Sequence, residues 1–294
     1  MRFVTFDRGS GPRAGVLVDQ AKSVVDLAEL GSGLPASVQA VIEGGARTRA
    51  AIETALRGIA KERTVPLESV KLLAPLPRPL RNIFCVGRNY FEHIREVHGA
   101  EPPKEAVSEH PVIFTKAPSC VIGPGAEIPG HLDYSNSLDY EGELAIVIGQ
   151  GGRGIKKADA FDHIFGYTIF NDVTARTLQR QHNQWFLGKS IDGFGPMGPA
   201  IVTADEVGDV KKLRLRTSVN GEVRQDEVVS SMIFDIPTVI ETISRTIRLE
   251  PGDVIATGTP SGVGLGFKPP KFMKKGDEVV VTIDGLGELR NRVG

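Results

Sequence analysis

The sequence predicts a strand-rich α+β fold, a mixed β-roll or sandwich with a small α+β domain at its N-terminal end. Two hairpin signals support this prediction: Asn220-Gly221 lies between two strand patterns, and residues 276–293 form a second strand–turn–strand pattern. Asn-Gly favours the two-residue turn that joins antiparallel strands. Few helical patterns separate the strands after residue 81, so the repeated strand–helix–strand units of a doubly wound sheet are not expected.

The first 70 residues have the pattern of a small domain. Strands are predicted over residues 2–6, 14–18 and 23–27, and helices over residues 36–43 and 46–60. A proline-rich stretch, KLLAPLPRPL, follows at residues 71–80. Because proline removes a backbone donor and stiffens the chain, this stretch is the predicted linker. The predicted organisation is therefore a small α+β domain over 1–70, a linker over 71–80 and a main domain over 81–294.

The main domain is predicted to begin with a strand, a helix, an exposed loop and a second strand. Their ranges are 82–87 for the first strand, 88–99 for the helical pattern, 100–110 for the loop and 112–118 for the second strand. Apolar residues at a 3.6-residue spacing predict one further helix over 237–248, with its apolar face against the core.

The charge balance and the two cysteines limit the class of protein. The 294 residues contain 35 Lys and Arg against 36 Asp and Glu, which argues against a general nucleic-acid or membrane-surface binder. No apolar run approaches the ~20 residues of a membrane span, and the N-terminus lacks a signal-peptide pattern. Cys85 and Cys120 lie in apolar surroundings, which favours buried free thiols. We expect a cytoplasmic protein with neither nucleic-acid nor membrane partners.

Carboxylates gather in residues 138–172, which read as a strand, a glycine-rich connection and a second strand. Alternation places Glu141 and Glu143 on one face of the first strand, about 7 Å apart between Cα atoms. From Leu144 onward both faces are apolar, so the strand is expected to be buried. Two carboxylates held so close in a core need a positive partner, and Asp172 at the end of the second strand offers a third oxygen donor. The pattern indicates Mg²⁺ or Mn²⁺ before Zn²⁺.

A simpler interpretation of these carboxylates stays open. Most Glu-x-Glu pairs on strands form solvated faces, and Asn171-Asp172 before a helical run suits a helix N-cap.

A dinucleotide-binding module is a distant alternative for the same segment. Gly149, Gly151 and Gly154 match the GxGxxG pattern after an apolar strand. The following helix would have to begin with apolar residues, but Arg153 and Lys156 occupy its start. Hairpins around the segment also argue against repeated βαβ units.

Seven segments, taken together and in order, resemble the fumarylacetoacetate hydrolase family over nearly all of residues 81–294. They are GRNYFEHIREV (87–97), FTKAP (114–118), LDYEGELAIVIG (138–149), FGYTIFNDVTAR (165–176), GKS with PMGPAIV (188–202), VNGEVRQ (219–225) and LEPGDVIATGTPSGVG (249–264). Within the family the chain looks closest to the acylpyruvate hydrolase and oxaloacetate decarboxylase branch. The resemblance implies a β-roll of the fumarylacetoacetase C-terminal type around a divalent metal, usually in a homodimer, with 81–294 as the catalytic domain.

The resemblance also implies roles for individual residues. The metal ligands fall on Glu141, Glu143 and Asp172, the catalytic groups on the dyad His93 and Glu96, carried by a lid helix, and on Lys189. Substrate-binding positions fall on Arg88, Lys116, Arg176, Gln179 and Thr259. One departure is Thr177, where the family often has Asp. From the sequence, Trp185 is expected in the core.

The implied chemistry is cleavage of a C–C bond beside a 2-oxo acid, by hydrolysis of an acylpyruvate-like 1,3-diketone through a metal-stabilised pyruvate enolate. His93 would take a proton from water with Glu96 orienting its ring, and Lys189 with the turn at Thr259 would stabilise the oxyanion. Decarboxylation of oxaloacetate at the same metal site is the alternative within this chemistry.

Overall fold

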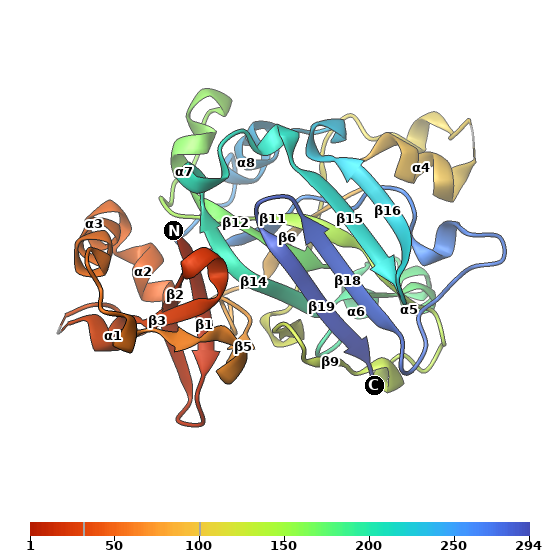
Figure 1. Ribbon diagram of the computed structural model, residues 1–294. Coiled ribbons are helices and arrows are strands. Elements are labelled where there is room, and N and C mark those ends of the chain that lie inside the picture. Colours follow the sequence, from red (N-terminus) through yellow and green to blue (C-terminus); the bar gives the residue numbers. More distant parts are fainter. Residues whose placement is uncertain (32, 100) are drawn as a thin grey trace.

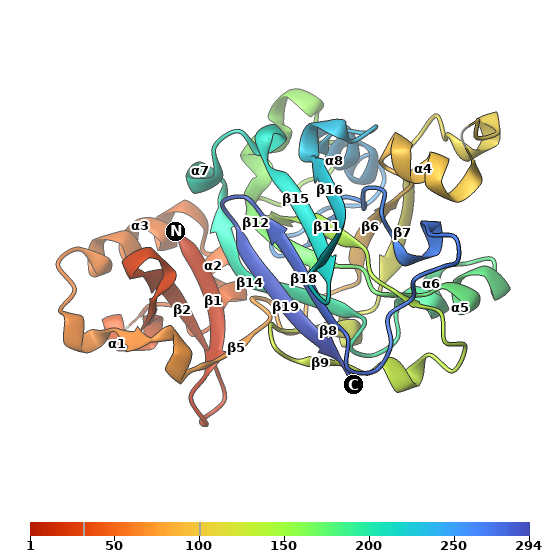
Figure 2. The ribbon, with the colours of Figure 1, turned by 45° about the vertical axis from the view of Figure 1, so that its right-hand side comes forward.

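The computed structural model describes residues 1–31, 33–99 and 101–294 and has the strand-rich α+β architecture that the sequence predicts. Two sheets pack face to face in the main body, and the N-terminal strands and helices lie at one side of it (Figure 1). Helix α4 (Phe91–His98) lies at the opposite side, beside the segment that follows β17 (Figures 1 and 2).

The larger sheet is mixed and runs in the order β4-β3-β2-β1-β14-β12-β11-β17-β6-β7. Its strands are β1 (Arg2–Asp7), β2 (Pro12–Val18), β3 (Ser23–Asp26), β4 (Val65–Pro66), β6 (Ile83–Gly87), β7 (Val112–Lys116), β11 (Gly142–Ile148), β12 (Ile164–Asn171), β14 (Gly195–Thr203) and β17 (Val254–Ala256). Strand β5 (Lys71–Leu73) pairs with β1, and β8 (Val121–Ile122) pairs with β14.

The second sheet runs in the order β16-β15-β18-β19-β9. Its strands are β9 (Glu127–Ile128), β15 (Arg214–Val219), β16 (Glu222–Val228), β18 (Glu278–Ile283) and β19 (Gly287–Val293). The predicted turn between β15 and β16 is confirmed: Asn220 and Gly221 have φ values of 51° and 81°, which a type I′ turn requires. The second predicted hairpin is β18–β19.

Strand β11 lies between two cores, as its apolar sequence predicts. Leu144 and Ile146 pack with Leu215 and Val281 of the second sheet, whereas Val147 packs in the cluster that contains residues of the N-terminal region. Helix α8 (Ile236–Ser244) covers the first of these clusters, and it ends four residues before the predicted end at 248. The sheet pair therefore shields the carboxyl groups at one end of β11 from bulk water.

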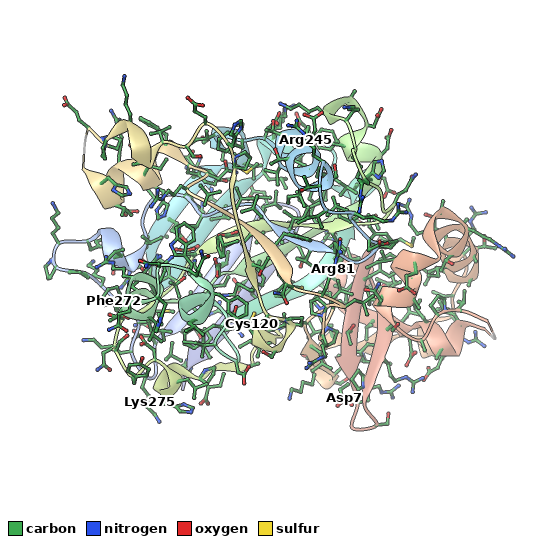
Figure 3. The ribbon with its side chains drawn as sticks, turned by 180° about the vertical axis from the view of Figure 1, so that it is seen from behind. Asp7, Arg81, Cys120, Arg245, Phe272 and Lys275 are labelled. Carbon is green, nitrogen blue, oxygen red and sulfur yellow. The ribbon has the colours of Figure 1, made fainter. Side chains whose placement is uncertain are left out.

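The N-terminal strands continue the larger sheet. Phe3 of β1 pairs with Ile201 of β14, and β5, inside the proline-rich stretch, pairs with β1. Helices α1 (Leu27–Leu30), α2 (Val38–Glu43) and α3 (Gly45–Leu56) accompany these strands, and Figure 3 shows Asp7 at the far end of the β1–β2 hairpin. The division into domains at 71–80 stays a prediction.

The predicted strand over 138–148 is interrupted. The structure divides it into β10 (Leu138–Asp139) and β11, with Tyr140 and Glu141 between them. Side chains replace the strand hydrogen bonds at this point: the Asp139 carboxylate accepts the N–H of Tyr140, and the side-chain oxygen of Asn171 accepts the N–H of Glu141. Strand β10 pairs instead with β13 (Thr174–Ala175).

This arrangement excludes two alternatives that the sequence left open and confirms one prediction. Strands β11 and β12 are antiparallel and a 3₁₀ segment, Lys157–His163, connects toward β12, so the dinucleotide-binding βαβ unit is wrong. Asn171 does not cap a helix, since α5 (Arg176–Gln181) begins after Ala175. Cys85 and Cys120 are buried free thiols, as predicted. Within the described ranges, no helix is both long and apolar enough to cross a bilayer.

Candidate metal centre and active site

The antiparallel pairing of β11 and β12 brings Glu141, Glu143 and Asp172 together. Gly142 pairs with Asn171. Glu141 and Glu143 flank Gly142 in the sequence and Asp172 follows Asn171, so the three residues meet at the same end of the two strands. One oxygen from each of the three carboxylates lies within 4.8 Å of the others, and all three side chains are buried. A group of buried carboxylate oxygens with this spacing fits a hard dication such as Mg²⁺ or Mn²⁺.

Three buried cations surround the carboxylates. The ammonium of Lys189 lies 2.7 Å from Glu141 Oε2 and 2.7 Å from Asp172 Oδ2. Lys116 Nζ lies 2.6 Å from Asp172 Oδ1, and Arg176 Nη1 lies 2.6 Å from Glu141 Oε1. Because none of these groups reaches bulk water, each positive charge is held by direct contact with a carboxylate.

Within the part of the chain that the structure describes, no cationic side chain contacts the carboxylate of Glu143. The N–H of Gly258 donates to its Oε2 over 2.8 Å, whereas Glu141 contacts both Lys189 and Arg176. Burial, together with the negative charges of Asp172 and Glu141, raises the pKa of Glu143 well above its usual value.

Glu141 shows the opposite behaviour. Burial alone would raise its pKa, but Lys189 and Arg176 outweigh burial and lower the pKa to about 2. Glu143 is therefore the carboxyl group of the three that is least favoured as an anion in the metal-free protein, and a dication bound beside it would supply the positive charge that favours ionisation.

Helix α4 presents the predicted dyad to the same site. His93 Nδ1 lies 3.3 Å from Glu96 Oε2, and the other oxygen of Glu96 accepts the N–H of Gly262 over 2.8 Å. His93 is only 9% exposed, so it does not lie on the solvated face of the helix. The side chain of Asn89 fixes the start of the helix, because its amide donates to Thr257 O over 2.8 Å.

A cavity of about 340 Å³ connects the dyad with the carboxylates. Its lining contains these predicted residues: Arg88, His93, Glu141, Glu143, Arg176, Gln179, Lys189 and Thr259. Among the described residues, Glu96, Lys116 and Asp172 lie behind this lining. Lys116 is fully buried and also donates to Val173 O over 3.1 Å. It therefore affects the site only through its ion pair with Asp172.

The profile of the family described as fumarylacetoacetate (FAA) hydrolase, C-terminal, matches residues 82–294. The chain belongs to this family.

Solved members of this fumarylacetoacetate hydrolase family share the fold of the chain, and several relatives are named for oxo-acid substrates of their own. Oxaloacetate tautomerase YisK of Bacillus subtilis (strain 168) is 52% identical over 228 residues, which are 78% of this chain and 74% of the relative. The fumarylacetoacetate hydrolase EaFAH from Exiguobacterium antarcticum has a TM-score of 0.84 at 42% identity, with 100% of this chain and 99% of that chain covered. A maleylpyruvate hydrolase from Sphingobium sp. SYK-6, in complex with manganese(II) and pyruvate, has a TM-score of 0.80 at 32% identity, with 100% and 98% covered.

Thr259 holds the turn of this family member in place. Its hydroxyl donates to Gly142 O over 2.9 Å and accepts from Gln225 Nε2 over 2.7 Å. Because a hydroxyl has one proton to donate, the Thr259 side chain is committed to the turn and is not free to donate to an oxyanion.

The expectation that Trp185 lies in the core is wrong. Trp185 is half-buried and lines the cavity, with its ring edge-to-face with Phe114 at 5.1 Å and the Arg88 guanidinium 5.8 Å from its centroid. A Cβ on Gly87 would lie 2.4 Å from the indole ring, so glycine is needed beneath it. No local sequence pattern indicates the roles of Asn89, Phe114 and Asp139, because their partners come from distant segments.

Proposed function

We propose that this protein is a divalent-metal-dependent enzyme that forms or breaks a bond at C3 of a 2-oxo acid, the carbon beside the keto group. The observation that carries the proposal is the buried group of Glu141, Glu143 and Asp172, of which Glu141 and Glu143 line one cavity together with His93. When bound there, Mg²⁺ or Mn²⁺ would hold the carboxylate and keto oxygens of the substrate and offset the negative charge that develops on the keto oxygen.

Within this proposal the dyad transfers protons. His93 faces Glu96 with Nδ1, which leaves Nε2 to move a proton between C3 and the keto oxygen of the substrate. Lys189 supplies a fixed positive charge, because Asp172 and Glu141 raise its pKa although burial alone would lower it. Arg176 lines the cavity, and its buried Nη2 has no partner within the described residues, so this nitrogen is left to bind a substrate oxygen.

Positive charge in the cavity favours a substrate with a second carboxylate. Arg88 and Arg180 line it together with Trp185. Burial and the nearby Arg88 and His93 lower the pKa of His98, so at neutral pH the two arginines provide the positive charge and not this histidine. The first candidate reaction is accordingly tautomerisation of a 2-oxo dicarboxylate of the oxaloacetate type, which the 52% identical tautomerase supports.

Hydrolysis of an acylpyruvate-like 1,3-diketone is the second candidate. The geometry of His93 and Glu96 suits activation of water as well as proton transfer at carbon, and the maleylpyruvate hydrolase neighbour contains pyruvate. In this reaction His93 would take the proton from water, and Lys189 would face the developing oxyanion. Decarboxylation of oxaloacetate needs neither water nor a second nucleophile and shares the same site.

The experiment is a side-by-side assay with Mn²⁺. Enol-to-keto conversion of oxaloacetate, loss of CO₂ from oxaloacetate and cleavage of acetylpyruvate would be followed with the wild type and with His93→Ala. We expect all activity to disappear after chelation with EDTA, and tautomerisation to be the fastest reaction. Unchanged turnover in EDTA would overturn the metal-dependent proposal, and a higher kcat/KM for acetylpyruvate would select hydrolysis.

We propose a homodimer in the cytoplasm as the working form. Family membership supports this assignment. Light scattering on the purified protein would give a mass near twice 31.6 kDa for a dimer, and a mass near 31.6 kDa would reject it.

A further inference from the structure

Asp139 is a fully buried carboxylate beside the site, and the chemistry proposed above gives it no role. It accepts hydrogen bonds from two parts of the chain besides its own neighbour. Its Oδ1 accepts from Tyr140 N at 2.9 Å and from Gly264 N at 2.7 Å, and its Oδ2 accepts from Arg176 Nε at 2.8 Å and from Leu265 N at 3.0 Å. A charged acceptor with four donors is a rigid junction, because moving it would leave several buried donors without a partner.

The first connection from Asp139 leads to Arg176. Pairing of Asp139 with Thr174 places β10 beside the start of α5. The guanidinium of Arg176 then lies between two carboxylates, with Nε on Asp139 and Nη1 on Glu141. This double contact fixes the plane of the guanidinium, and so it fixes where the unpartnered Nη2 lies.

The second connection leads to the glycine-rich turn at 262–266, which we call the receiving turn. Gly264 and Leu265 donate to Asp139, while Gly262 donates to Glu96 of α4 over 2.8 Å. Side chains would not fit at this contact: a Cβ on Gly264 would lie 2.6 Å from Asp139 Oδ1, and a Cβ on Gly266 would lie 2.1 Å from the Glu96 carboxylate. Figure 2 shows this segment, in blue after β17, between α4 and α5.

We propose that Asp139 is a positioning residue that couples the docking of α4 to the orientation of Arg176. The receiving turn is held between two carboxylates, Glu96 on the helix side and Asp139 on the site side. When Asp139 fixes the turn, the N–H of Gly262 stands ready for Glu96, and Glu96 in turn orients His93. The same carboxylate aligns Arg176, so the dyad and the arginine are set together. This inference rests on the proposed function, because it concerns the same site.

The first test is hydrogen exchange, which does not depend on knowing the substrate. In Asp139→Asn an amide replaces one carboxylate oxygen, so either the receiving turn or Arg176 faces a donor where it had an acceptor. We expect faster amide exchange in peptides covering 262–266 and also in α4, measured by mass spectrometry on the intact protein. Exchange that increases at 138–140 alone, with α4 unchanged, would overturn the coupling. A failed activity assay would leave this result unaffected, so the two proposals can fail separately.

The second test is kinetic. We expect Asp139→Asn to lower kcat by about 10- to 100-fold, as changes in groups that orient active-site residues commonly do. Asp139→Glu should not restore kcat, because it keeps the charge but moves the carboxylate against the closely packed receiving turn. In an Asp139→Asn, Glu96→Ala double variant, the fold-decrease in kcat should be smaller than the product of the two single-variant decreases. We expect it to be smaller by a factor of at least about five. If the two decreases in kcat multiply fully in the double variant, or if Asp139→Glu restores kcat, the coupling is overturned. Asp139 would then act only through its charge or through its contribution to stability.

A matched control is available at Asp253. This carboxylate is also buried, pairs with Arg81 and accepts the N–H of Glu250, but it lies far from α4; Figure 3 shows Arg81 toward the N-terminal part. Asp253→Asn should leave exchange in 262–266 and kcat unchanged. If Asp139→Asn does not fold, Gly264→Ala disturbs the same contact from the turn side and should give the same two signatures. Normal exchange and kcat in Gly264→Ala would overturn the proposal.

Discussion

At the scale of single residues, Glu141 and Glu143 show how neighbours determine the state of a carboxylate. The two are alike in chemistry and two positions apart, but Glu141 contacts Lys189 and Arg176 while Glu143 contacts one backbone N–H. The pKa of Glu141 is therefore lowered to about 2, and that of Glu143 is raised by burial and by Asp172 and Glu141. Removing one or the other should have opposite effects on stability.

Glu143→Gln should abolish metal binding without destabilising the metal-free protein. The amide removes a buried, repelled carboxylate, so we expect the free energy of unfolding in EDTA to stay within about 1 kcal/mol of wild type or to rise. Glu141→Ala leaves Lys189 and Arg176 short of a partner and should cost about 3 kcal/mol. Urea unfolding and titration calorimetry with Mn²⁺ measure both effects. Equal destabilisation by the two substitutions would contradict this account.

Binding of the dication should release a proton. Because its pKa is raised in the folded, metal-free protein, Glu143 takes up a proton at a pH where an exposed carboxyl has lost it, and the metal must displace that proton. Affinity should therefore rise with pH, by about tenfold per unit below the folded pKa. For the same reason the stability of the metal-free protein should fall as pH rises between the unfolded and folded pKa values. Calorimetry in buffers of different ionisation enthalpy counts the protons, and a count of zero would reject the assignment.

At the level of secondary structure, the residue that caps helix α8 can be tested independently of the site. Asp235 caps α8, and its side chain accepts from Thr238 N over 3.0 Å. The amphipathic pattern predicted this helix, but its end at Ser244 depends on the tertiary contacts around it. By contrast, no pattern within residues 138–148 predicts the break in the strand at Tyr140, because the acceptor for the N–H of Glu141 is the distant side chain of Asn171.

Asp235→Ala should lower the free energy of unfolding by about 1 kcal/mol at neutral pH. Burial alone would raise the pKa of Asp235, but the Thr238 hydroxyl and N–H lower it below its usual value. The contribution of the cap is therefore present above the unfolded pKa, about 3.9, and is lost as pH falls through the folded pKa. Thermal unfolding at pH 7 and pH 3 should show a difference that shrinks in acid, and Asp235→Asn serves as the control that keeps the cap.

At the scale of the whole molecule, the N-terminal strands and the main body share one sheet and one core. Phe3, Leu27 and Ile52 belong to the same cluster of buried side chains as Val147 and Met197. The family profile begins only at residue 82, so the matched segment alone does not contain the strand that covers the edge of β14. We therefore do not expect the N-terminal region and the main body to fold fully when they are separated.

A chain of residues 81–294 should be less soluble and less stable than the full protein. Without β1, the edge of β14 and the apolar side chains beneath it become exposed, and unpaired edges of this kind promote aggregation. Expression yield and the melting temperature of the truncated chain measure the effect. A soluble fragment with the melting temperature of the full protein would instead support an independent domain boundary at 71–80.

The strand-rich class, the hairpin at Asn220-Gly221 and the candidate carboxylates can be predicted from the amino-acid order, because they depend on alternation, turn chemistry and short spacing. The folded chain was needed to show which cations contact which carboxylate, that Trp185 lines the cavity, and that Asp139 joins Arg176 to the receiving turn. These contacts join segments separated by 17 to 126 residues. Local preferences act over a few residues, whereas such contacts form only when the sheets pack and remove the groups from water.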